Sequence, residues 1–225
     1  MKLPRDVPVM MLPNATLFPQ AFLPLYIFEP RYRQMLSDAL HSNRMFAVAM
    51  QRPGSMRETP LPVAGLGLIR VAVGHRDGTS HLILQGLARV QLEQAVRYKP
   101  YRIQRIRPLQ TPPCDNVTVD ALIAKVRELL AERIELGLTL PLSMLSLDNS
   151  GSHSAPLSSS SKEIMHCLDS FANLDQAIDL VSHAVLPGAV ERQAILETVD
   201  VEARLRRLIY FLLAEIRAKR KGNGS

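Results

Sequence analysis

The chain has little of what a disulfide scaffold, a secreted precursor or a membrane protein needs. Its 225 residues include two cysteines, Cys114 and Cys167, which form no paired motif. Such sparse usage is typical of a reducing cytosol, although a disulfide between the two stays open. No stretch approaches the roughly 20 apolar residues of a membrane span. Pro4, Asp6 and Pro8 interrupt any signal-peptide run. We therefore expect a soluble, cytoplasmic protein that spans no membrane.

Motifs that carry catalysis are also missing. None of the 11 glycines is followed by lysine, which excludes a Walker-type phosphate loop. No Gly-x-Ser-x-Gly elbow presents a nucleophile. Ser161 and Lys162 are adjacent at a predicted helix start, where a capping serine is expected rather than a catalytic dyad. Scattered groups can still converge in space, but the sequence predicts no enzymatic activity and no cofactor.

A metal site needs cysteine or histidine at ligand spacing, and the most suggestive pair is His75 and His81. The pair flanks Asp77-Gly78, which favours a two-residue hairpin turn between strands at 67–73 and 82–90. With such a turn, residue 75 lies opposite residue 80, and residue 81 lies opposite residue 74. The two histidines then point to opposite faces of the hairpin. We therefore predict ordinary surface histidines and no metal site.

The charge of the chain is unevenly distributed. The net charge is +6, but residues 1–110 hold 15 lysines and arginines against six acidic residues, whereas residues 111–225 hold 12 against 15. A basic half favours an anionic partner such as nucleic acid or an acidic protein. A solvated surface is the favoured explanation of this charge. The composition, 47% hydrophobic and 21% charged, is enough to build a core.

The pattern of apolar residues divides the chain into a β half and an α half. Strands are predicted at 7–11, 22–28, 45–50, 67–73, 82–90 and 101–109, and Pro24 marks the second as an edge strand or as the site of a bulge. A short helix begins at Pro30. Helices follow at 119–134, 162–172, 174–185, 190–199 and 200–216, and Asp200 is predicted to cap the last of them. Seven serines between residues 149 and 161 predict a mobile loop. The fold class is therefore α+β, with a β-rich lobe over 1–112 and a helical lobe over 113–225.

Several runs resemble the LON domain, the amino-terminal substrate-binding domain of Lon-type ATP-dependent proteases. They are Leu17-Phe18-Pro19, Ile27-Phe28-Glu29-Pro30-Arg31-Tyr32, Leu84-Gln85-Gly86-Leu87-Ala88-Arg89-Val90 and the stretch from Leu186-Pro187 to Leu205. Each run alone is mostly hydrophobic residues and turns. Their order and spacing together carry the resemblance, which covers the chain apart from the serine-rich loop and the basic tail.

The resemblance implies a barrel-like, PUA-like lobe followed by a helical lobe. It also implies a module that recognises unfolded or tagged polypeptides. The quoted runs resemble those of bacterial family members in which the LON domain stands alone. The ATPase module and the protease domain are not expected here, so a peptidase S16 label would attach without activity. A homodimer is a further expectation, because domains of this family pair.

Two sets of residues are candidates for binding. For polypeptides, the loop 52–61 offers Met56, Arg57 and Leu61. Phe18, Phe28 and Tyr32 are expected to pack inside. The nine methionines are expected mainly in the core, with adaptable surface contacts as the alternative. The less favoured partner is RNA, through stacking and phosphate contacts of a basic stretch. That stretch comprises Arg97, Tyr98, Lys99, Tyr101, Arg102, Arg105 and Arg107.

Overall fold

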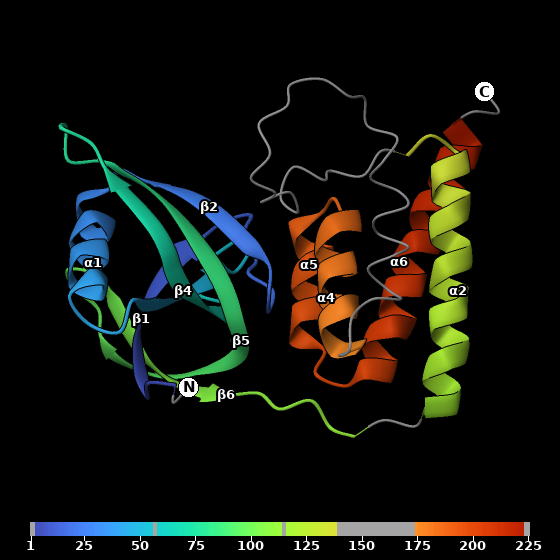
Figure 1. Cartoon of the computed structure of the whole chain (residues 1–225), viewed down its shortest axis with the longest axis horizontal. Helices are drawn as coiled ribbons and strands as arrows, with labels where there is room; N and C mark the ends of the chain where they lie inside the picture. The colour runs from blue at the N-terminus through green and yellow to red at the C-terminus, as the bar shows by residue number, and fades with distance from the viewer. Residues whose placement is uncertain (1–2, 56–57, 114–115, 139–173, 223–225) are drawn as a thin grey trace. The chain divides into compact units, whose positions relative to one another are not determined.

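A computed structural model describes residues 3–55, 58–113, 116–138 and 174–222. The chain forms two compact units, 1–110 and 111–225. The first holds a six-stranded sheet and one helix, and the second is helical, as Figure 1 shows, so the predicted α+β class is confirmed. Cys114, Cys167, the predicted helix 162–172 and the serine-rich loop 149–161 lie outside the described residues.

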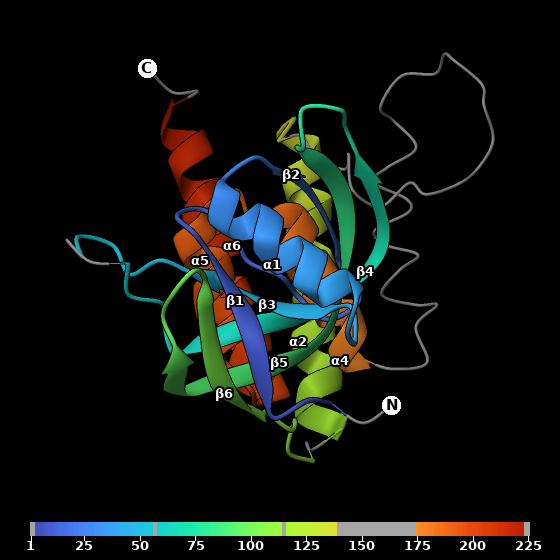
Figure 2. The same ribbon diagram turned by 90° about the vertical axis from the view of Figure 1, so that its left-hand side faces the viewer.

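The first unit is a strongly curved sheet that closes on itself. Its strands are β1 (Asp6–Leu12), β2 (Phe22–Ile27), β3 (Met45–Met50), β4 (Val63–Gly74), β5 (Ser80–Arg97) and β6 (Arg102–Pro108). They lie in the order β2-β5-β4-β3-β1-β6, and β5 also pairs with β6. Because β5 is 18 residues long, its first part pairs with β2 and its last part with β6. Figure 2 shows helix α1 (Pro30–Leu40) packed across these strands.

Strand β2 has one unpaired edge. It pairs with β5 alone among the strands that the structure describes, which confirms the edge position predicted from Pro24. The N–H of Gly86 donates to the oxygen of Ala21, which lies one residue before β2. Since backbone groups alternate in direction along a strand, Leu23, Leu25 and Ile27 continue this ladder. Phe22, Pro24 and Tyr26 therefore turn their backbone groups toward the open edge.

The core of the first unit forms on both faces of β1 and β3. All six residues of β3 are buried. One cluster unites Met10, Phe46 and Leu84 with the inner side of α1, and the other unites Val9, Ala47 and Leu66. The described methionines all lie in this core, as predicted; they are Met10, Met11, Met35, Met45 and Met50.

Two aromatic predictions hold and one is wrong. Phe18 and Tyr32 are buried, but Phe28 is 59% exposed. The reason is strand parity. Ile27 points into the core, so Phe28 falls on the outer side, the same side as Tyr26.

The second unit contains four described helices. They are α2 (Asn116–Glu135), α4 (Leu174–Val185), α5 (Ala189–Glu197) and α6 (Val201–Gly222), close to the predicted bounds. Asp200 caps α6, because its carboxylate accepts from the Ala203 N–H at 2.7 Å, as predicted. Of the helices within the described ranges, none is both long and apolar enough to cross a membrane.

Candidate functional site

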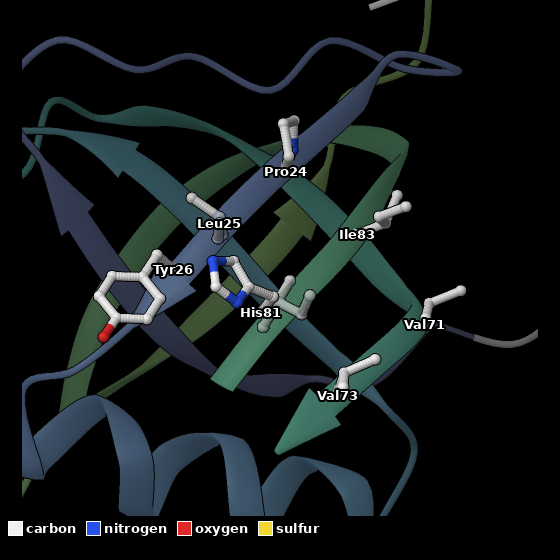
Figure 3. A pocket seen from close by; sticks show the side chains of 8 residues that line it. Pro24, Leu25, Tyr26, Val71, Val73, His81 and Ile83 are labelled. Carbon is white, nitrogen blue, oxygen red and sulfur yellow. The ribbon is translucent and has the colours of Figure 1, made fainter. Parts of the chain in front are cut away.

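An apolar hollow of the first unit lies on the outer face of β2, β5 and β4. Two cross-strand rows form it: Pro24, Ile83 and Val71 in one, and Tyr26, His81 and Val73 in the other. Leu25 and Leu82 lie beneath them. Figure 3 shows these side chains together on the three strands. We call this surface the β2–β5–β4 groove; its volume is about 390 Å³.

A β-bulge in β4 places two valines in this groove. The register of β4 on β5 shifts between Ile69 and Val71, where Arg70 is the extra residue. Ile69 is buried, and strict alternation would bury Val71 and Val73 as well. The bulge reverses the parity, so both valines face outward and are about half exposed. Arg70 also faces out and donates to Gln85 at 2.6 Å.

The groove is an apolar patch next to aromatic side chains. Tyr26 and Phe28 stack with ring centroids 5.9 Å apart, and both are at least half exposed. Exposed single hydrophobic residues are common on proteins, but contiguous ones rimmed by polar groups mark binding surfaces. Because this patch borders the open edge of β2, an extended chain can meet apolar side chains and unpaired backbone groups at one place.

The prediction that His75 and His81 point apart is wrong. The observed loop has three residues, Arg76-Asp77-Gly78, because the His75 N–H donates to the oxygen of Thr79 and Gly78 adopts a φ of +81°. The longer loop shifts the register by one, so His81 lies opposite Val73. A one-residue shift moves a side chain to the other face. Nε2 of His75 and Nδ1 of His81 are therefore 2.7 Å apart at the end of the groove.

The loop predicted to bind polypeptides lies elsewhere on the first unit. Met56 and Arg57 lie outside the described residues, and Leu61 is half-buried with its N–H bound to the Met50 oxygen. Glu58 in this loop forms a bidentate pair with Arg31. That pair holds the pKa of Glu58 below its usual range, mainly through the hydrogen bond from Arg31. In Figure 2 this loop and the β4–β5 hairpin extend from different sides of the sheet.

The structure brings together only part of the basic stretch. The Arg97 guanidinium lies over the Tyr101 ring at 4.8 Å and that of Arg102 over the Tyr98 ring at 4.9 Å. Tyr101 is buried, and its hydroxyl donates to Asp38. Burial raises the pKa of Tyr101, and the bond to Asp38 adds to the shift.

The other members of the stretch lie along or beside β6. Arg105 pairs with Asp6 at 3.2 Å and Arg107 with Glu93 at 3.3 Å, while Lys99 is exposed. These ion pairs with acidic neighbours offset part of the positive charge that would otherwise attract the phosphates of a nucleic acid.

The groove is a candidate binding surface that sequence reasoning missed. Its members look like ordinary strand residues, and only the hairpin register and the bulge place them on one face. For metals, no three histidine, cysteine, aspartate or glutamate side chains gather closely enough to hold an ion within the described ranges.

Comparison with known proteins identifies the class. The profile of the ATP-dependent protease La (LON) substrate-binding domain matches residues 6–214. The chain therefore belongs to the family of LON substrate-binding domains, as the resemblance predicted.

Relatives are similar along nearly all of this chain. Lon protease 2 of Myxococcus xanthus is 27% identical over 217 residues, and the Lon protease of Desulfosudis oleivorans is 22% identical over 216 residues. These alignments cover 93% and 92% of this chain but 24% of each relative. The chain thus spans about a quarter of the length of the curated relatives it matches.

Solved structures show the same fold. The N-terminal domain of the Lon protease from Mycobacterium avium complex matches with a TM-score of 0.66 at 18% identity, covering 92% of this chain and 97% of that one. A Lon N-terminal domain protein from Xanthomonas campestris matches with a TM-score of 0.54 at 19% identity, covering 92% and 98%. At such identity the likeness establishes the fold.

Proposed function

We propose that this chain is a non-catalytic binding module that holds extended, apolar segments of unfolded or tagged polypeptides in the β2–β5–β4 groove. Family membership supports polypeptide binding in general, since the matched domain is described as substrate-binding. The observation that carries the choice of surface is the juxtaposition of the two apolar rows with the open edge of β2.

The mechanism combines strand addition with apolar contact. In an extended segment that pairs with β2, a backbone oxygen would accept a hydrogen bond from the Tyr26 N–H. Backbone N–H groups of the segment would donate to the backbone oxygens of Phe22 and Pro24. Such pairing gives affinity that does not depend on sequence, and pockets for alternate side chains give selectivity. On the outer face, alternate side chains of the segment would then lie beside Pro24 and Tyr26. This selects segments with apolar residues at every second position. Such a module would act as an adaptor or a chaperone-like holder.

The test is fluorescence anisotropy of the purified protein with a reduced, alkylated and labelled polypeptide at two salt concentrations. Val73→Asp places a charge in the groove, and Val96→Asp is its matched control. Both valines lie on strands of the first unit and are 52% and 54% exposed. We expect Val73→Asp to weaken binding about tenfold, because a carboxylate must be desolvated against the apolar segment. Val96→Asp should change it less than about twofold.

If Val73→Asp and Val96→Asp bind the polypeptide with equal affinity, the groove is not the binding surface. In that case replacing Met56, Arg57 and Leu61 together tests the loop 52–61 as the binding surface. Labelled RNA in the same assay tests the basic stretch 97–107. Tight RNA binding that falls steeply with salt would favour the RNA alternative, because such binding releases counterions.

Self-association is the competing use of the same face. A homodimer through the groove would compete with the polypeptide, so light scattering at several protein concentrations accompanies the assay. A dimer of wild type that Val73→Asp, but not Val96→Asp, converts to monomer would assign the groove to self-association instead.

A further inference from the structure

We propose that His75 and His81 form a binding site for a divalent late transition-metal ion, with Cu²⁺ bound more tightly than Zn²⁺. This inference does not rest on the proposed function. It rests on the hairpin geometry that places Nε2 of His75 and Nδ1 of His81 2.7 Å apart.

The two imidazoles already bring one ring nitrogen each into direct contact. Their rings stand at 87° to each other with centroids 4.9 Å apart, and the facing nitrogens share a hydrogen bond. The shared proton lies between the two nitrogens, so it must leave before one ion can bind both lone pairs. For two neutral rings, the donor ring moves its proton from the inner to the outer nitrogen. Both inner nitrogens then offer lone pairs, and no net proton is lost.

The distances require only a small adjustment. Metal–imidazole bonds are about 2.0–2.1 Å long. Two such ligands on one ion at angles of 90–109° therefore stand about 2.9–3.4 Å apart. The nitrogens must separate by a few tenths of an ångström. Both side chains are exposed, so rotation about their side-chain bonds provides this without moving the strands.

The backbone that carries the pair is well fixed. His81 lies within the ladder of β5, flanked by β2 and β4. His75 follows β4 directly, and its N–H bond to Thr79 closes the loop. Preorganisation of this kind reduces the entropy that chelation costs.

The charges around the pair are mixed. The Asp77 carboxylate accepts from both the N–H and the hydroxyl of Thr79 within the same loop. The Arg33 guanidinium reaches Gly78 from α1.

The donor set selects the ion. Two imidazole nitrogens and water suit Cu²⁺, Ni²⁺ and Zn²⁺, whereas Mg²⁺ prefers oxygen. With no third protein ligand among the described residues, affinity follows the intrinsic order, which places Cu²⁺ first. Water fills the remaining positions, so this is an open site at the end of the groove.

Tyr26 provides a local readout. Its ring lies 4.8 Å from the His81 ring, and the chain has five tyrosines and no tryptophan. A Cu²⁺ ion held by the pair should quench Tyr26 emission, and Tyr26→Phe should remove the quenched component. The experiment titrates Cu²⁺, Zn²⁺ and Mg²⁺ into the purified full chain, following tyrosine emission and, separately, heat.

We expect one Cu²⁺ ion to bind with quenching, Zn²⁺ to bind more weakly, and Mg²⁺ to have no effect. His75→Gln and His81→Gln should each weaken Cu²⁺ binding about tenfold or more, since even second-shell changes cost 10- to 100-fold. His41→Gln, an exposed histidine at the end of α1, should leave it unchanged. Unchanged affinity and quenching in both His75→Gln and His81→Gln would overturn the proposal. Far-UV circular dichroism and urea unfolding like those of wild type would show that these variants fold.

Discussion

The ring of Tyr26 lies 4.8 Å from the ring of His81, its direct cross-strand neighbour, and also stacks with the ring of Phe28. Tyr26 thus lies at the centre of the aromatic part of the β2–β5–β4 groove. We expect Tyr26→Ala to weaken binding of the unfolded polypeptide about tenfold, because aromatic side chains dominate interface energetics.

The matched control for that change is Tyr210→Ala. Tyr210 is 68% exposed on α6, in the other unit, so its loss removes an exposed tyrosine that is no part of the groove lining. Anisotropy with the same labelled polypeptide measures both variants. A similar loss in both would mean that the groove has no special part in binding.

The fold was largely predictable because its signals are local. Pro30 marked the start of α1, Pro24 marked the edge strand, and Asp200 marked the cap of α6. Each depends on the chemistry of one residue and its immediate neighbours. The closure of the sheet through the β5–β6 pairing depends instead on contacts between distant residues. The apolar periodicity of the sequence does not predict such a pairing.

The groove was not predictable because it depends on which face of the sheet each strand residue occupies. One extra residue in the hairpin loop brings His75 to the face of His81, and one extra residue at Arg70 turns Val71 and Val73 outward. Asp77-Gly78 is compatible with both two- and three-residue loops. The sequence therefore could not decide which side chains share a face.

Gly86 allows a loop to lie directly on the sheet. A Cβ at this position would come within 1.9 Å of the backbone oxygen of Phe18. The N–H and oxygen of Gly86 also bond Ala21 and Gln20, at the entry to β2. We expect Gly86→Ala to lower the free energy of unfolding by about 3 kcal/mol, the upper range for overpacking.

Displacement of the entry to β2 should also weaken polypeptide binding by Gly86→Ala. Gly222→Ala is the control, because nothing lies within 4 Å of its added Cβ at the end of α6. Urea unfolding of both variants is the measurement. A Gly86→Ala protein as stable as wild type would show that the loop does not pack this closely.

Arg204 holds two helices of the second unit together through buried charge. Its side chain is fully buried, and Nη1 lies 2.6 Å from Oδ1 of Asp179, which is buried as well. Asp175 and the Val199 oxygen take further bonds from the same guanidinium. We expect Arg204→Met to cost about 3–5 kcal/mol in the free energy of unfolding, because it leaves the Asp179 carboxylate buried without its cation.

Two companions to Arg204→Met separate charge from packing. The double variant Arg204→Met with Asp179→Leu should recover most of the loss, since an apolar pair replaces the ions. Arg206→Met breaks an exposed pair with Glu202 and should cost less than about 1 kcal/mol. Far-UV circular dichroism during urea unfolding follows the helices. If Arg204→Met alone is as stable as Arg206→Met, the buried pair of Arg204 and Asp179 does not stabilise the fold.

His183 on α4 should make the second unit sensitive to acid. Burial lowers the pKa of His183 to about 4, with a smaller contribution from the nearby Arg192 charge. In an unfolded chain the ring titrates near pH 6.5. The unfolded state therefore binds the proton more tightly, so stability is complete above pH 6.5 and is lost as the pH falls toward 4. The expected loss at pH 5 is about 2 kcal/mol relative to pH 7.

His183→Leu removes this titration while the carboxylates of the chain remain. The difference in the free energy of unfolding between pH 7 and pH 5 should therefore shrink by about 2 kcal/mol. His41→Gln, which replaces an exposed ring, should keep the wild-type difference. Urea unfolding at pH 7, 6 and 5 measures all three proteins. If His183→Leu and wild type lose stability in parallel, the acid sensitivity comes from other groups, because a neutral buried imidazole in the native state requires the two curves to diverge below pH 6.5.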